Sequence, residues 1–172
     1  MITLQAQLLS AETSHRFAPF GSVIQARPGG AAINSGSSQR HEAVPALDLQ
    51  REGGRAVLAL YIASARLFPF AAHGLERHRL SDQVFLPLAG ARRCVLLVAP
   101  AGLHQPRPED CLAFVTQGDQ GVRIAAGTWH HGLLALDDGP WAVLERRAEA
   151  LDCDEIVWAA PLMLSLPVEL SA

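Results

Sequence analysis

The chain has 172 residues, of which 49% are hydrophobic and 18% charged, so it can bury one sizeable core and we expect a single domain over residues 1–172. A net charge of −3 argues against a large basic surface for nucleic acid or an anionic membrane. Three cysteines without metal-type spacing, no signal peptide and no apolar run of about twenty residues favour a cytoplasmic protein without disulfides.

The first third of the chain alternates short extended segments with loops. Apolar and polar residues alternate over residues 2–9, which predicts a strand. A short helix is expected over residues 11–17 and a short strand over residues 22–25. The Gly/Pro-rich stretch 27–32 predicts a loop, and a polar stretch from Ile33 to Arg40 reads on its own as a solvated loop.

The middle of the chain carries the clearest strands. The continuous apolar run 56–63 and the still more apolar run 92–99 predict buried strands. Between them, residues 75–80 predict a strand, residues 80–82 a turn, and residues 83–87 a second strand. This arrangement would place Gln83 across from Glu76 and His78, which share one strand face.

The last third continues the same pattern. Strands are expected over residues 112–116, 122–125 and 141–146, with a hairpin-type turn at residues 118–121. In the tail, helical periodicity is confined to residues 154–159. Many short strands at roughly ten-residue spacing predict an all-β sandwich or barrel.

Four polar side chains from two separate segments are candidates for a functional site. Glu76, His78 and Gln83 lie close in sequence, and His130 comes from a distant strand. Two imidazoles, a carboxylate and an amide meeting inside a small barrel could hold a borderline divalent ion or orient a small polar substrate. Strand parity leaves open whether Arg77 belongs to the same site.

The spacing of these residues resembles the two motifs of the cupin superfamily. Glu76-x-His78 stands where many cupins have His-x-His, Gln83 stands at the Glu position, and Gly90 follows at the expected distance. The second motif, Gly-x-x-His, is Gly127-Thr128-Trp129-His130. Two of the four ligand positions therefore differ from the common metal-binding pattern.

The Glu and Gln at these two positions restrict the resemblance to one family within the cupins, the ureidoglycolate lyases. Residues 75–90 read Leu-Glu-Arg-His-Arg-Leu-Ser-Asp-Gln-Val-Phe-Leu-Pro-Leu-Ala-Gly, and residues 127–131 read Gly-Thr-Trp-His-His, both similar to that family. Further similarities are Phe20-Gly21-x-Val23-Ile24, Ile33-Asn34-x-Gly36 and Asp152-Cys153-Asp154. The resemblance spans most of the chain.

The resemblance implies a fold, a reaction and an assembly. The fold would be a cupin-type β-barrel (a double-stranded β-helix or jelly roll) with a few short helices. The reaction would split ureidoglycolate into glyoxylate and urea during allantoin and purine degradation, in a homodimer. It selects His130 over His131 as the inward imidazole, with Trp129 packed outside the barrel or at a subunit contact.

The resemblance also implies roles for individual residues. Glu76, His78, Gln83 and His130 would be catalytic, and Glu76, His78 and His130 would be the ligands of a divalent metal such as nickel. Asn34 and Arg40 match polar positions of the family, so the stretch that carries them is as well explained by a flap over the site as by a loop. The planar fork of Arg40 suits a substrate carboxylate.

Two other functions stay open at this point. One is a hydrolase that acts on the same substrate and releases ammonia and carbon dioxide. The other is a non-catalytic cupin that binds a small carboxylic acid without turnover.

Overall fold

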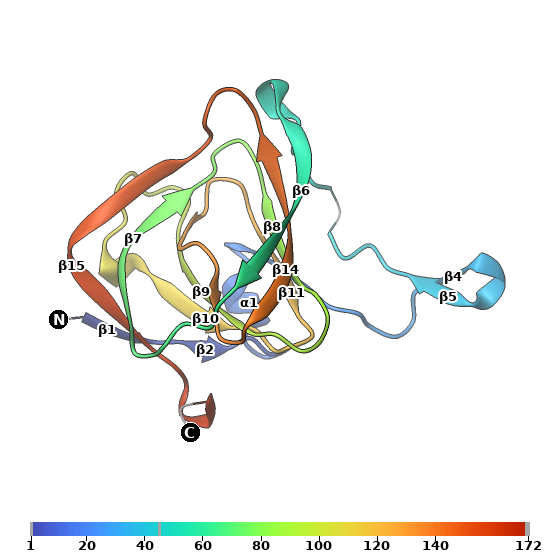
Figure 1. The fold of residues 1–172 in the computed structure, drawn as a ribbon, viewed down its shortest axis with the longest axis horizontal. Coiled ribbons are helices and arrows are strands. Elements are labelled where there is room, and N and C mark those ends of the chain that lie inside the picture. Colours follow the sequence, from blue (N-terminus) through green and yellow to red (C-terminus); the bar gives the residue numbers. More distant parts are fainter. Residues whose placement is uncertain (1, 45, 171–172) are drawn as a thin grey trace.

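Two sheets curl around each other into a barrel in the computed structural model, which describes residues 2–44 and 46–170 (Figure 1). Within these residues the larger sheet has eight strands. Seven of them follow the order β1 (Ile2–Gln5), β15 (Asp154–Ser165), β7 (Phe70–Arg77), β12 (Trp129–His130), β9 (Cys94–Ala99), β10 (Leu112–Val115) and β2 (Gln7–Leu8), and β13 (Leu134–Ala135) pairs with β9.

The smaller sheet closes the other side of the barrel. Its order is β3 (Gly21–Ile24), β11 (Gly121–Ile124), β8 (Gln83–Pro87), β14 (Gly139–Arg147) and β6 (Arg55–Ala63). Helical structure among the described residues is confined to α1 (Ser14–Phe17) and the 3-10 turns Asn34–Gly36, Arg51–Gly53, Pro108–Asp110 and Val168–Leu170. The prediction of an all-β cupin-type barrel is confirmed. In the part of the chain that is described, no helix combines the length and the apolar character needed to cross a membrane.

Apolar residues form two clusters on the two faces of β9. Phe85, Phe114 and Trp141 belong to the cluster between the two sheets, and Leu97 and Trp129 to the cluster that the strands of the larger sheet enclose. Every residue of β9 is buried, since both of its faces are covered. This explains why its sequence is a continuous apolar run rather than an alternating one.

Several local expectations differ from the structure. The turn at residues 118–121 joins β10 to β11, which lie in different sheets, so it is no hairpin. Likewise β7 and β8 do not pair, and β7 ends at Arg77 rather than continuing to residue 80. Residues 154–159 form the first half of β15, not a helix: residues 154–157 pair with β7, and half-buried side chains alternate with exposed ones. Ser171 and Ala172, at the end of the predicted tail, lie outside the described residues.

The polar stretch after residue 30 forms a small hairpin of its own. Its strands are β4 (Ala31–Ile33) and β5 (Ser38–Arg40), joined through the 3-10 turn at Asn34–Gly36. Figure 1 shows this hairpin projecting well away from the barrel, beyond β6 and β14. We refer to residues 31–40 as the arm.

Candidate active site

Glu76 and His130 face each other on neighbouring strands of the larger sheet. They occupy the same rung of the β7–β12 pair, so their side chains project from the same sheet face. The Glu76 Oε1 and His130 Nε2 atoms are 3.7 Å apart, and His130 is only 2% exposed. The sequence prediction that His130 faces the barrel interior agrees with this burial.

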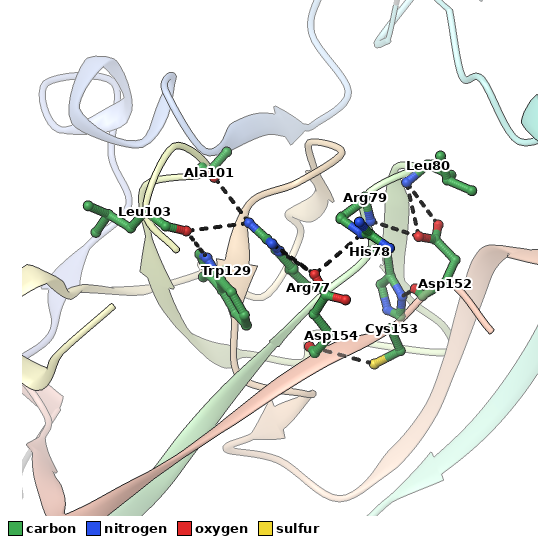
Figure 2. Close-up of polar contacts among 10 residues, drawn as sticks. All are labelled: Arg77, His78, Arg79, Leu80, Ala101, Leu103, Trp129, Asp152, Cys153 and Asp154. Carbon is green, nitrogen blue, oxygen red and sulfur yellow. Dashed lines mark hydrogen bonds and ion pairs between the residues drawn. The ribbon is translucent and has the colours of Figure 1, made fainter. Parts of the chain in front are cut away.

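His78 lies one residue beyond the end of β7, where a separate segment fixes its ring. Its Nδ1 atom lies 2.6 Å from the main-chain oxygen of Asp152. The Asp152 carboxylate accepts the backbone N–H groups of Arg79 and Leu80, each at 2.9 Å (Figure 2). A carbonyl can only accept, so the ring proton of His78 sits on Nδ1 and leaves Nε2 as a free acceptor. The centroids of the His78 and His130 rings are 5.5 Å apart.

Gln83 reaches the same point from the smaller sheet. Its Oε1 atom lies 3.2 Å from His130 Nε2. The other ring nitrogen of His130, Nδ1, lies 2.9 Å from the carbonyl of Thr128 and therefore carries the proton. With His130 protonated on Nδ1, Nε2 and the Gln83 oxygen are both acceptors and repel each other at this distance. Either a cation lies between them, or the Gln83 amide is turned so that its NH2 group donates to Nε2.

Burial sets the protonation state of His130. Desolvation lowers its pKa to about 4, against the smaller opposing effect of the Thr128 carbonyl. The ring is therefore neutral at pH 7 and can donate its Nε2 lone pair.

The donor set fits a divalent metal ion. One ligand atom each from Glu76, His78 and His130 lies within 4.8 Å of the others. Both imidazoles have their second nitrogen bonded to a backbone carbonyl, as metal-ligating histidines usually do. A second group, Glu76 with Cys153 and Glu155, is equally close. Burial and then neighbouring carboxylates raise the pKa of the Cys153 thiol to about 11, so it is a poor ligand at neutral pH.

A cavity of about 240 Å³ opens beside these residues. Glu76, His78 and Gln83 line one part of it, and Tyr61 and Glu145 line another. It is smaller than the roughly 300–1,000 Å³ of drug-sized sites, which suits a small substrate. A larger hollow of about 730 Å³ runs along β15, but its lining contains no imidazole. Another of about 370 Å³ is lined by Glu76, His73 and His131 but by neither His78 nor Gln83, so the converging groups point to the smaller cavity.

Arg77 and Trp129 lie on the opposite face from the site. The Arg77 guanidinium sits 4.4 Å from the centre of a Trp129 ring and bonds to Asp154 at 2.8 Å (Figure 2). Trp129 is 1% exposed and donates its indole N–H to the carbonyl of Leu103. The sequence left Trp129 either packed outside the barrel or at a subunit contact; the structure buries it on the face opposite the site, under the loop that carries Leu103. Arg77 lies on this opposite face and does not belong to the site.

Asn34 and Arg40 lie on the arm and do not line the cavity. Arg40 forms an ion pair with Glu42 at 3.2 Å, and both side chains are exposed. The structure therefore brings together Glu76, His78, Gln83 and His130, but within one chain it does not bring the two arm residues to them.

Sequence reasoning missed Asp152, Tyr61 and Glu145. Asp152 was present in a segment of family similarity without a role. Glu145 carried a usable signal, since it follows Trp141 and Val143 at period two and must share their inward face. Tyr61, the sole tyrosine of the sequence, was hidden in an apolar run.

Comparison with known proteins agrees with this geometry. A family model described as ureidoglycolate lyase matches residues 1–165. A ureidoglycolate lyase of Burkholderia cepacia is 40% identical over 148 residues, covering 84% of this chain and 81% of the relative. One from Azotobacter vinelandii is 39% identical over 141 residues (81% and 84%), and one from Rhizobium etli is 33% identical over 153 residues (88% and 90%). The chain belongs to the ureidoglycolate lyase family.

Proposed function

We propose that this chain is a carbon–nitrogen lyase that cleaves ureidoglycolate into glyoxylate and urea, a step of allantoin and purine degradation. One observation carries the proposal: in a chain of this family, a carboxylate and two imidazoles have ligand atoms within 4.8 Å of one another, and two of these residues, Glu76 and His78, line a small cavity. Their chemistry matches the needs of the reaction.

The reaction moves one proton from the hydroxyl group of the substrate to its departing nitrogen. The carbinol hydroxyl of the substrate loses a proton as its C–N bond breaks, and the departing urea nitrogen gains one. Glu76 is the base where the site works without an ion, since it is the one carboxylate among the converging groups, and it is a ligand where the site holds an ion. Hydroxyl and nitrogen are bonded to the same carbon, so Glu76 can return the proton to the nitrogen. Such acid–base assistance is typically worth about 10²–10⁴-fold in rate.

The two histidines and Gln83 orient the substrate and any bound ion. His130 is neutral at pH 7, so it acts through its Nε2 lone pair and not as a proton donor. Glu76, His78 and His130 would hold a divalent ion such as nickel, which would polarise the carbinol oxygen and attract the substrate carboxylate. Gln83 adds an amide without charge and keeps the His130 ring in place.

Assembly as a homodimer belongs to the same proposal. The outer face of β6 exposes Leu58, Leu60 and Ile62 by 67%, 67% and 80%. A contiguous apolar stripe of this kind on an edge strand is typical of a protein–protein contact. The arm projects on the side of the barrel where β6 and β14 lie (Figure 1). A second copy seated there would receive it, and Asn34 and Arg40 would then bind substrate in the partner's cavity.

The proposal places the enzyme in the cytoplasm, in keeping with three cysteines that form no disulfide. The test is to incubate the purified protein with racemic ureidoglycolate and to measure glyoxylate, urea and ammonia. Glyoxylate and urea in equal amounts support the lyase. Ammonia in place of urea would indicate the hydrolase, and binding without any product would indicate a non-catalytic cupin.

A further inference from the structure

A second carboxylate lies in the cavity, and the proton chemistry above does not use it. Glu145 projects inward from β14, and its side chain is only 12% exposed. A carboxylate removed from water is costly unless it is paired or has a binding role. The partners of Glu145 therefore decide which of its acceptor positions can still bind a ligand.

Two neighbours hold the Glu145 carboxylate, one on each oxygen. The Tyr61 hydroxyl donates to Oε2 at 3.2 Å. The Arg147 Nε group donates to Oε1 at 3.1 Å, although the Arg147 side chain is itself 65% exposed. Tyr61 keeps its proton, because burial and the nearby Glu145 charge raise the pKa of its hydroxyl. It can only steady Glu145 as a donor.

The Glu145 carboxylate keeps free acceptor positions beside the cavity after both of these hydrogen bonds are made. A carboxylate offers about four acceptor positions, and Tyr61 uses one of the two on Oε2. Glu145 and Tyr61 line the same 240 Å³ cavity as Glu76 and His78. The cavity thus offers a negatively charged acceptor, Glu145, in addition to Glu76 and His78.

A ureido group is the complementary ligand. Its substituted N–H and one N–H of its NH2 end point in the same direction and form two parallel donors, the geometry that a carboxylate accepts best. A carboxylate or carbonyl group of a substrate would be repelled at this position. We infer that Glu145, steadied by Tyr61, is the specificity-determining residue that binds the ureido group of the substrate. This inference rests on the proposed function for the identity of the substrate, but not for the chemistry of the subsite.

A pair of probes that cannot be cleaved tests the inference. Ureidoacetate has the ureido group and the carboxylate but no carbinol hydroxyl. Levulinate has the same heavy-atom shape with both nitrogens replaced by carbon, so it lacks the N–H donors. Titration calorimetry of both probes measures the preference for N–H donors without any turnover.

We expect the wild-type protein to bind ureidoacetate at least about tenfold more tightly than levulinate, since levulinate lacks the N–H pair that would bond to the charged acceptor. Glu145→Gln should remove most of this preference, because the amide presents a donor where an acceptor is needed. Tyr61→Phe should reduce it less, and Glu149→Gln, an exposed site that does not line the cavity, should leave it unchanged.

Steady-state kinetics on ureidoglycolate provide the second readout. Glu145→Gln should raise KM more than it lowers kcat and should weaken inhibition by urea but not by glyoxylate. A wild-type protein that shows no preference between the probes would overturn the inference, as would a preference that survives Glu145→Gln. If ureidoacetate binds with this dependence while ureidoglycolate is not cleaved, the subsite stands and the proposed lyase activity fails.

Discussion

The backbone N–H of Gly127 donates to the carbonyl of His78 at 2.6 Å. This bond joins two segments that are about fifty residues apart in the sequence, one carrying Glu76 and His78, the other His130. Together with the β7–β12 rung, it fixes the distance between the two imidazoles from the backbone itself. Substitutions of the side chains that this bond and this rung hold in place test their roles.

Glu76→Gln keeps the shape of the side chain and removes its charge and basicity. We expect turnover of ureidoglycolate to fall by at least about 10²-fold, the usual scale for losing acid–base assistance. Release of glyoxylate and urea from purified variants measures the effect. Glu12→Gln, an exposed carboxylate remote in sequence from the site, is the matched control and should retain full activity. Full activity in Glu76→Gln would remove this residue from the mechanism.

Metal removal should abolish activity, and nickel, manganese or zinc should restore it, because two imidazoles and a carboxylate supply the ligands for such an ion. His78→Ala should also lower the metal content of the purified protein, measured by elemental analysis. His73→Ala, an exposed imidazole on the same strand, should leave the metal content unchanged. Activity that persists through exhaustive chelation would mean that the site works through hydrogen bonds alone.

Acid should destabilise the fold through His130. The pKa of this ring is about 4 in the folded protein and near 6.5 when unperturbed, so between these values the unfolded chain binds more protons. Stability from this group is complete above pH 6.5 and is lost as the pH falls toward 4, by about 1.4 kcal/mol for each pH unit in that window. Urea unfolding at pH 7 and at pH 4.5 should show a larger loss for the wild type than for His130→Asn. An equal loss in both proteins would contradict the neutral, buried ring.

Asp152→Ala should loosen the turn that carries His78. The variant loses the acceptor for the backbone N–H groups of Arg79 and Leu80, which leaves the partly buried N–H of Leu80 unpaired at a cost of about 1–3 kcal/mol. We expect a lower melting temperature together with a lower kcat, since the carbonyl of residue 152 would no longer hold the imidazole rigidly. Unchanged kcat at a reduced melting temperature would limit Asp152 to a purely structural role.

Arg40→Lys should raise KM more than it lowers kcat, because lysine keeps the charge but loses the planar fork. Arg27→Lys, just before the arm, is the control.

Subunit mixing tests whether the arm acts in the partner's cavity. If it does, mixing the Arg40→Ala protein with the Glu76→Gln protein should restore roughly a quarter of wild-type activity, because half of the dimers then contain one subunit of each kind and each such dimer has one intact site. No recovery after subunit exchange, checked by light scattering for dimers, would argue against an arm that acts across the interface.

Local patterns predicted the strands better than their partners. Residues 83–87 and the run around Cys94–Ala99 were recognisable from apolar content and bounding turns. Which sheet a strand joins depends on contacts far away in the chain, so the sheet change after residue 118 and the strand at residues 154–159 were not recognisable.

The candidate site came partly from spacing and partly from resemblance. Period two predicts that Glu76 and His78 share a face, and the resemblance to the second cupin motif selects His130 over His131. The burial of Trp129 was not predictable, because it depends on a loop about 26 residues earlier whose Leu103 carbonyl accepts the indole N–H. The placement of the arm was equally beyond local reasoning, since its position relative to the barrel is set by the chain on either side of it.

Because β12 is so short, the side of the sheet on which Trp129 lies shows whether the strand pairs in the correct register. The strand has two residues, and Trp129 and His130 point to opposite faces. A slip of a single residue would turn the indole toward Glu76 and Gln83 and the imidazole into the apolar cluster on the other face. Such a protein would retain its strands and lose its chemistry, so circular dichroism would report it as folded. Trp129 is one of three tryptophans, and a change in its share of the emission, away from the Arg77 guanidinium, would instead report the fault and separate misaligned variants from truly inactive ones.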